Sequence, residues 1–83
     1  MQQPSDAFMD LSKRAPKWTT LSQVVSGCLE SGVNSQESLY IVAIWMLDNG
    51  CEAHGREILR GIESNTSVIG TYALAALQAI EAG

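Results

Sequence analysis

The run Leu39-Tyr-Ile-Val-Ala-Ile-Trp-Met-Leu47 contains no charged or strongly polar residue. A helix that is apolar around its whole circumference must be enclosed on all sides, so this run predicts the central element of the domain. A helix that crosses a bilayer needs about 20 apolar residues. The run is less than half that length, so we expect no membrane insertion and place it in the core of a soluble protein.

The composition is that of a small, acidic and weakly charged domain. The chain has 83 residues, of which 46% are hydrophobic and 17% charged, and its formal net charge is −4. Soluble proteins average roughly 25% charged residues, so we expect part of this surface to be apolar and covered by a partner. An acidic body repels phosphate backbones, which argues against nucleic acid as that partner.

The compartment is predicted from the N-terminus and the cysteines. The first residues contain no continuous apolar segment of the secretory type, because charges stand at Asp6, Asp10 and Lys13. Cys28 and Cys51 fit free thiols, since a chain with an ample apolar core does not need a disulfide, and a single disulfide between them is the alternative. We therefore expect a cytoplasmic protein, and the sequence assigns the two cysteines no role beyond packing.

Start and stop signals divide the chain into an N-terminal arm, residues 1–17, and one helical domain, residues 18–83. Ser5 or Asp6 could cap a short helix in the arm. In the domain, Thr20-Leu-Ser-Gln23 and Asn34-Ser-Gln-Glu37 both have capping-box spacing, so each predicts the start of a helix.

The ends of these helices and the two that follow are also predicted. Gly32 is placed to stop the first helix and Asn49-Gly50 to stop the second, central one. We expect two more helices, at about residues 52–62 and after a cap at Asn65 or Thr66. The prediction is an all-α fold, a short antiparallel helical bundle with four main helices plus the arm. The expected apolar faces are Leu21, Val24, Val25, Cys28 and Leu29; Gly55, Ile58, Leu59 and Ile62; and Ile69, Tyr72, Ala73, Ala76, Leu77 and Ile80.

The helix pair around Gly50 matches the register of a degenerate tetratricopeptide unit over residues 36–69. Any antiparallel helix pair with a glycine turn and a small residue at the crossing matches several of these positions, so chance similarity is the alternative. The register places these residues inward: Leu39, Val42, Ala43 and Met46 in the central helix, and Tyr72, Ala75, Ala76 and Ala79 in the last helix.

The opposite sides of the same two helices are then the predicted partner-binding groove. This groove consists of Tyr40, Ile44 and Leu47 from the central helix and Ala73, Leu77 and Ile80 from the last helix. Coverage of these side chains by the arm or by a second copy of the chain, giving a homodimer, is the alternative.

The segment Ala43-Ile-Trp45-Met-Leu-Asp-Asn-Gly50, followed by Glu52-Ala53 and an amphipathic helix, resembles the small tetratricopeptide-like chaperones of type III secretion systems. The resemblance covers about residues 35–80 and rests on packing residues, the Ala-x-Trp and the glycine five residues after the Trp. Larger members of that family have more helices on both sides of this unit. The resemblance implies a non-enzymatic cytoplasmic chaperone that, with a very small helical co-chaperone, cradles the amphipathic C-terminal helix of the needle subunit.

Three other functions have partial support in the sequence. Glu37-Ser38-Leu39 is similar to the acidic-Ser-Leu signature of acyl and peptidyl carrier proteins, in which Ser38 would bear phosphopantetheine; however, carriers have Asp at the first position and a long loop before it. Residues 52–61 could act as a DNA-recognition helix, but Glu52 and Glu57 oppose that function. Cys51 and His54 lack a third catalytic group and further zinc ligands, so we predict no catalytic residue, metal or cofactor.

Overall fold

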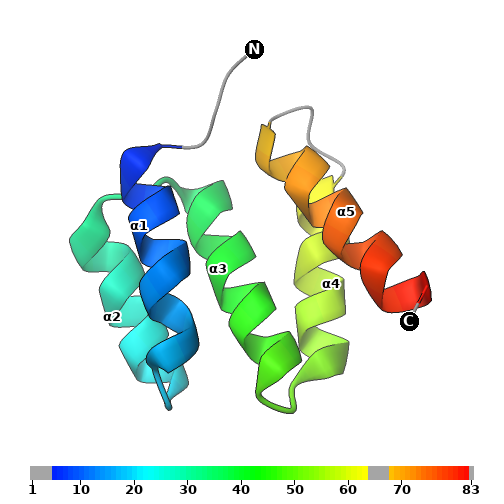
Figure 1. The fold of residues 1–83 in the computed structure, drawn as a ribbon, viewed down its shortest axis with the longest axis horizontal. Helices are drawn as coiled ribbons and strands as arrows, with labels where there is room; N and C mark the ends of the chain where they lie inside the picture. Colours follow the sequence, from blue (N-terminus) through cyan, green and yellow to red (C-terminus); the bar gives the residue numbers. More distant parts are fainter. Residues whose placement is uncertain (1–4, 64–67, 83) are drawn as a thin grey trace.

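Five α-helices and one short 3₁₀ helix follow one another in the computed structural model, which describes residues 5–63 and 68–82 (Figure 1). This part of the chain contains no β-strand, so the predicted all-α fold is confirmed. The proposed caps Asn65 and Thr66 lie outside the described residues. The elements are α1 (Asp6–Arg14), η1 (Ala15–Lys17), α2 (Leu21–Ser31), α3 (Ser35–Asp48), α4 (Glu52–Glu63) and α5 (Val68–Ala82).

Side-chain caps set the beginnings of the first three α-helices, as the sequence predicts. The Ser5 hydroxyl accepts a hydrogen bond from the Phe8 N–H at the start of α1. Both predicted capping boxes form, one between Thr20 and Gln23 and one between Asn34 and Glu37. Each box satisfies backbone N–H groups that a helix start would otherwise leave without a partner.

Glycines end α2 and reverse the chain after α3. Gly32 has φ 73° and Gly50 has φ 89°, in the left-handed region that residues with a Cβ rarely adopt. A third glycine, Gly55, allows α3 and α4 to cross closely. A Cβ at Gly55 would lie 2.9 Å from the carbonyl oxygen of Ala43 and 3.1 Å from the Leu47 side chain.

The helices lie side by side in a body with extents of 33 × 31 × 17 Å, with α3 in the centre (Figure 1). Helices α1 and α2 pack on one side of α3, and α4 and α5 on the other, with the α3–α4 contact the most extensive. The N-terminal arm takes part in the core, because Phe8 and Leu11 of α1 are fully buried. The other buried apolar residues are Ala15, Val24, Cys28, Ile41, Ala43, Trp45, Leu59, Ile62, Ile69, Ala73 and Leu77.

Several predictions of which helix face is buried are wrong. Leu39, expected to point inward, is exposed, whereas Ile41 and Trp45 are buried. Helices α1, η1 and α2 cover a side of α3 that the tetratricopeptide register leaves open, so residues on that side are buried in place of Leu39. On α2 only Val24 and Cys28 of the expected stripe are buried, and Leu21, Val25 and Leu29 are exposed.

The register predicted for the last helix is also wrong. Ala75 and Ala79 are exposed and Tyr72 is partly exposed, whereas Ile69, Gly70, Ala73 and Leu77 face the core. Burying Ile69 and Leu77 removes more apolar area from water than burying alanines, so this rotation of α5 is favoured.

Candidate functional site

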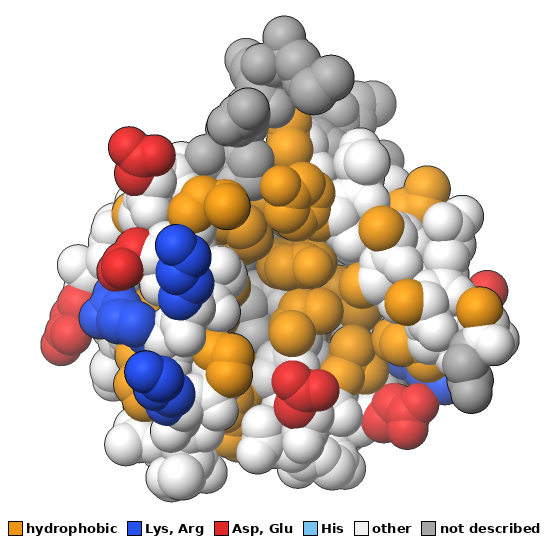
Figure 2. All heavy atoms as spheres, in the orientation of Figure 1, with side chains coloured by type: hydrophobic (Ala, Val, Ile, Leu, Met, Phe, Trp, Pro, Cys, Tyr) orange, Lys and Arg blue, Asp and Glu red, His pale blue; other side chains and the backbone are white. Residues whose placement is uncertain are grey.

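An apolar surface runs along one face of the molecule, over α3 and between α1 and α5 (Figure 2). Tyr40 and Ile44 of α3 are half-buried and form its floor. Met9 of α1 and Tyr72 of α5 are 44% and 37% exposed and lie on its two sides. Half-buried Ile80 of α5 packs against the core cluster, and its direction on the helix differs from that of Tyr72 by roughly 80°. We call this surface the front groove.

Three aromatic rings join the helices that border the front groove. The ring centroids of Phe8, Tyr40 and Tyr72 lie 5.8 Å, 6.2 Å and 6.1 Å apart in the three pairs, with tilted or edge-to-face geometry. Such pairs contribute about 0.5–1.5 kcal/mol beyond area burial. Burial raises the pKa of Tyr40, and the electrostatic effect of Tyr72 raises it further. The groove floor therefore stays uncharged at neutral pH.

A hollow of about 160 Å³ opens in the front groove between α1, η1 and α3. An engineered apolar cavity of roughly 150 Å³ holds a benzene molecule, so this hollow has the size for one Leu or Phe side chain. Trp45 forms part of its wall and is fixed there, because its indole N–H donates to the Trp18 carbonyl oxygen at 3.0 Å. The residues lining the hollow are Ser12, Ala15, Pro16, Tyr40, Ile41, Ile44, Trp45 and Asp48.

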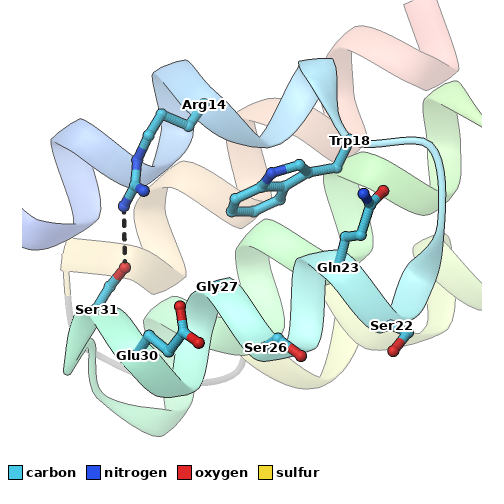
Figure 3. Close-up of a pocket in the computed structure, with 8 residues that line it drawn as sticks. All are labelled: Arg14, Trp18, Ser22, Gln23, Ser26, Gly27, Glu30 and Ser31. Carbon is cyan, nitrogen blue, oxygen red and sulfur yellow. Dashed lines mark hydrogen bonds between the residues drawn. The ribbon is translucent and has the colours of Figure 1, made fainter.

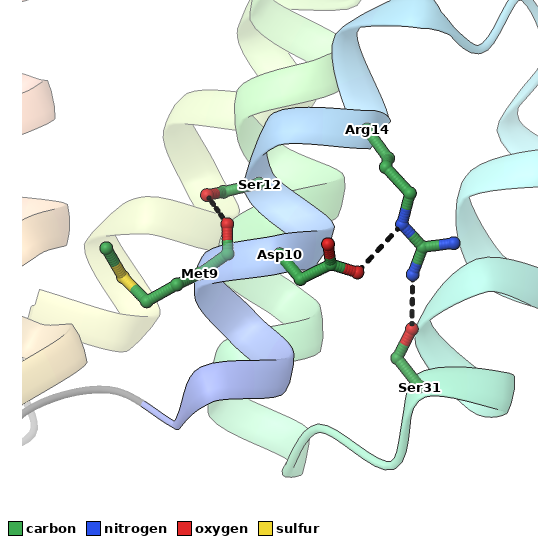
Figure 4. A network of polar contacts seen from close by, with 5 residues as sticks. All are labelled: Met9, Asp10, Ser12, Arg14 and Ser31. Carbon is green, nitrogen blue, oxygen red and sulfur yellow. Dashed lines mark hydrogen bonds and ion pairs between the residues drawn. The ribbon is translucent and has the colours of Figure 1, made fainter.

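The helices that form the hollow carry exposed residues of opposite charge. Exposed Lys13 and Lys17 belong to α1 and η1, and exposed Asp48 lines the opposite side of the hollow. Figure 4 shows that Met9 points away from α2, whereas Arg14 points toward α2 and binds Asp10 at 3.0 Å and Ser31 at 3.2 Å. The Arg14 guanidinium therefore interacts on the side of α1 that faces α2, away from the groove.

A buried carboxylate holds α1 in position as one wall of the groove. Glu37 is only 3% exposed. Its carboxylate accepts hydrogen bonds from the Ser5 N–H at 3.0 Å, the Ser5 hydroxyl at 3.1 Å and the Asn34 N–H at 3.2 Å. One side chain thus completes the cap of α3 and anchors the start of α1 to it.

A second, polar cleft of about 530 Å³ lies between α1, η1 and α2 (Figure 3). The Trp18 ring lies over Gly27, where a Cβ would overlap it, so glycine is required for this contact. The Arg14 guanidinium is 6.0 Å from the Trp18 ring centroid. These contacts join α1 to α2, and we interpret the cleft as a packing seam.

The structure separates the six predicted groove residues. Tyr40, Ile44 and Ile80 are half-buried, and the first two line the hollow. Leu47 instead packs against Gly55 of α4. The expectation that Ala73 and Leu77 line the groove is wrong, because their exposed fractions are 0% and 5%. Both lie on the side of α5 that packs into the core.

Sequence reasoning missed Met9, Ser12, Pro16 and Tyr72 as groove residues. The first three belong to the arm, whose position against α3 has no sequence signal. The sequence places Ala7, Phe8 and Leu11 on one side of this helix, of which Phe8 and Leu11 are buried, but it does not indicate what they pack against. Tyr72 was assigned inward by the tetratricopeptide register, and the rotation of α5 moves it to the edge of the groove.

The residues considered for chemistry are not brought together. Ser38 is half-buried, and its carbonyl oxygen accepts a long hydrogen bond from the buried Cys28 thiol at 4.0 Å. Burial raises the pKa of the Cys28 thiol, and a hydrogen bond with the Ser38 side chain opposes part of the rise. Cys51 and His54 are both exposed, and no hydrogen bond joins them in the part of the chain that the structure describes. In the same residues no group of three His, Cys, Asp or Glu side chains could hold a metal ion.

Compared with known protein families, curated proteins and solved structures, the chain shows no match. No helix among the described residues has the length and apolar character that crossing a membrane requires.

Proposed function

We propose that this protein is a cytoplasmic, non-enzymatic chaperone or adaptor that sequesters an amphipathic helix of another protein in the front groove. The observation that carries the proposal is the apolar floor formed by Tyr40 and Ile44, which the chain's own helices cover only in part. The family resemblance around Trp45 suggests the partner's identity: a small helical subunit of a type III secretion apparatus, with a small helical co-chaperone as a second partner.

The shape of the front groove suits a helix better than an extended peptide. Recognition of an extended peptide by strand addition needs an exposed sheet edge, and the described residues contain no β-strand. A bound helix presents apolar side chains at positions i, i+3, i+4 and i+7. One of these would enter the hollow beside Trp45, and the others would lie on Tyr40 and Tyr72.

The charges at the hollow predict how the bound helix is oriented. Lys13 and Lys17 favour acidic residues on one flank of the partner helix, and Asp48 favours a basic residue on the other. Charges at an interface rim act mainly on specificity and association rate. The apolar contacts supply most of the affinity: a helix covering roughly 600 Å² would gain about 15 kcal/mol, before association and ordering costs remove most of it.

The test is co-expression with the products of neighbouring small genes, followed by affinity purification and size exclusion. Ile44→Asp and Met9→Asp should each reduce recovery of the bound partner at least tenfold, because both place a charge against its apolar face. Leu74→Asp is the matched control, since Leu74 and Met9 are both 44% exposed. Full recovery with both groove variants would refute the groove as the binding site, and circular dichroism verifies that each variant is folded.

A further inference from the structure

A second apolar surface lies on α2 and the start of α3. Leu21, Val25 and Leu29 recur every four residues along α2 and are 40%, 42% and 79% exposed. Leu39 of α3 is also exposed, at 42%. We call these four residues the α2–α3 face. Contiguous exposed apolar residues of this kind mark interaction sites in soluble proteins.

The α2–α3 face combines a projection with a depression. Leu29 is the most exposed large apolar side chain in residues 5–63 and 68–82. It stands at the edge of a shallow hollow of about 430 Å³. The hollow is lined by Cys28, Leu29, Val33, Ser35, Ser38 and Leu39. A surface with a knob beside a hole of mainly apolar character can pair with a copy of itself, because a twofold axis places each knob in the other copy's hole.

The charge pattern also favours a second copy over a partner with a charged surface. Residues 21–29 contain no Asp, Glu, Lys or Arg, and the residues lining the hollow are uncharged, although the whole chain carries −4. Two copies meeting here bring no like charges into contact. An acidic or basic partner would find no complementary charge on this face, whereas the front groove offers Lys13, Lys17 and Asp48.

We propose that two copies of this chain associate through their α2–α3 faces around a twofold axis, with Leu29 of each copy in the hollow of the other. The front groove stays open in this dimer. Leu39 and Ile44 are five residues apart on α3, so they point in directions roughly 140° apart on the helix. The dimer therefore presents two independent grooves. Because the apolar patch is small, we expect a dissociation constant in the micromolar range, as for interfaces at the lower end of the size scale.

Sedimentation velocity of the purified full chain, from micromolar to millimolar concentration, tests the dimer. The wild type should shift from monomer to dimer as its concentration rises. Leu29→Asp should raise the dissociation constant by roughly 30-fold or more, which corresponds to a loss of about 2 kcal/mol of binding free energy, as for a hot-spot residue. Val25→Asp repeats the test at a second position outside the core. Circular dichroism should show unchanged helicity for both.

Two controls distinguish this surface from the others. Leu74→Asp, on α5, and Ile44→Asp, in the front groove, should both leave the dimer intact. A chain that stays monomeric at every concentration would overturn the proposal. A dimer that survives Leu29→Asp and Val25→Asp but dissociates with Ile44→Asp would also overturn it, and would show that a second copy occupies the groove instead.

Discussion

Removing the Glu37 carboxylate should destabilise the protein more than any other single loss of a polar side chain described above. Glu37 is 3% exposed and connects the start of α3 to the start of α1. In Glu37→Ala the Ser5 N–H, the Ser5 hydroxyl and the Asn34 N–H all lose their acceptor. The α3 capping box is broken by the same substitution.

The size of the effect follows from these contacts. Hydrogen bonds to a charged group contribute about 1.5–3 kcal/mol each, and loss of a helix cap costs about 1 kcal/mol. Ser5 and Asn34 lie at the surface, so water replaces part of what is lost. We therefore expect Glu37→Ala to lower the free energy of unfolding by about 3–4 kcal/mol. Glu37→Gln, which keeps one acceptor oxygen, should cost about half as much.

Urea denaturation followed by the fluorescence of Trp18 and Trp45 measures this change. The matched control is Glu30→Ala, which removes an exposed carboxylate from α2 and should stay within about 0.5 kcal/mol of wild type. In a double-mutant cycle, Ser5→Ala and Glu37→Ala together should cost less than the sum of the two single variants, because they share hydrogen bonds. A Glu37→Ala protein as stable as the Glu30→Ala control would refute the anchoring role.

Three further predictions test packing and ionisation. Gly55→Ala should destabilise the protein by about 1–3 kcal/mol, because the new Cβ meets the α3 backbone. The control Gly61→Ala, in the same helix, places its Cβ in open space and should stabilise the protein by up to about 1 kcal/mol. Equal effects of the two substitutions on the urea midpoint would contradict the close crossing of α3 and α4. Leu77→Asp should abolish the cooperative thermal transition, since its side chain is in the core. Burial raises the pKa of Cys28 and of Tyr40, so both side chains stay protonated in the folded protein at a pH where they ionise in the unfolded chain. The urea midpoint should therefore fall as the pH rises above the ordinary thiol pKa of about 8.5. A urea midpoint that stays constant up to the pH of phenol ionisation would contradict this.

The helix boundaries could be predicted from the sequence because they depend on local chemistry. The Thr20 and Asn34 capping boxes and the left-handed Gly32 and Gly50 each act within a few residues of their own position. Neighbouring turns supply the hydrogen bonds that define these ends, so the predictions hold whatever packs against the helix. The all-α fold follows from the same signals.

The face that each helix buries could not be predicted equally well. Helix α3 is apolar on nearly every side, so periodicity does not distinguish the side that contacts α1 and α2 from the side that contacts α4. The stripe of α2 is as apolar at Leu29 as at Val24, yet only Val24 is buried. Burial there depends on where the arm and α3 lie, and that placement is set by packing between residues far apart in the chain.

The most direct test of the central claim is photo-crosslinking from the groove. That claim is that α3 has one side enclosed by its own chain and another that receives a helix from a different protein. p-Benzoylphenylalanine would replace Met9 in one protein and Leu74 in another, each co-expressed with the partner, because the two side chains are equally exposed. Crosslinks from position 9 to a single amphipathic helical segment of the partner, with little from position 74, are the predicted result. Equal yields from both positions, or crosslinks from position 9 only to a second copy of this chain, would contradict it.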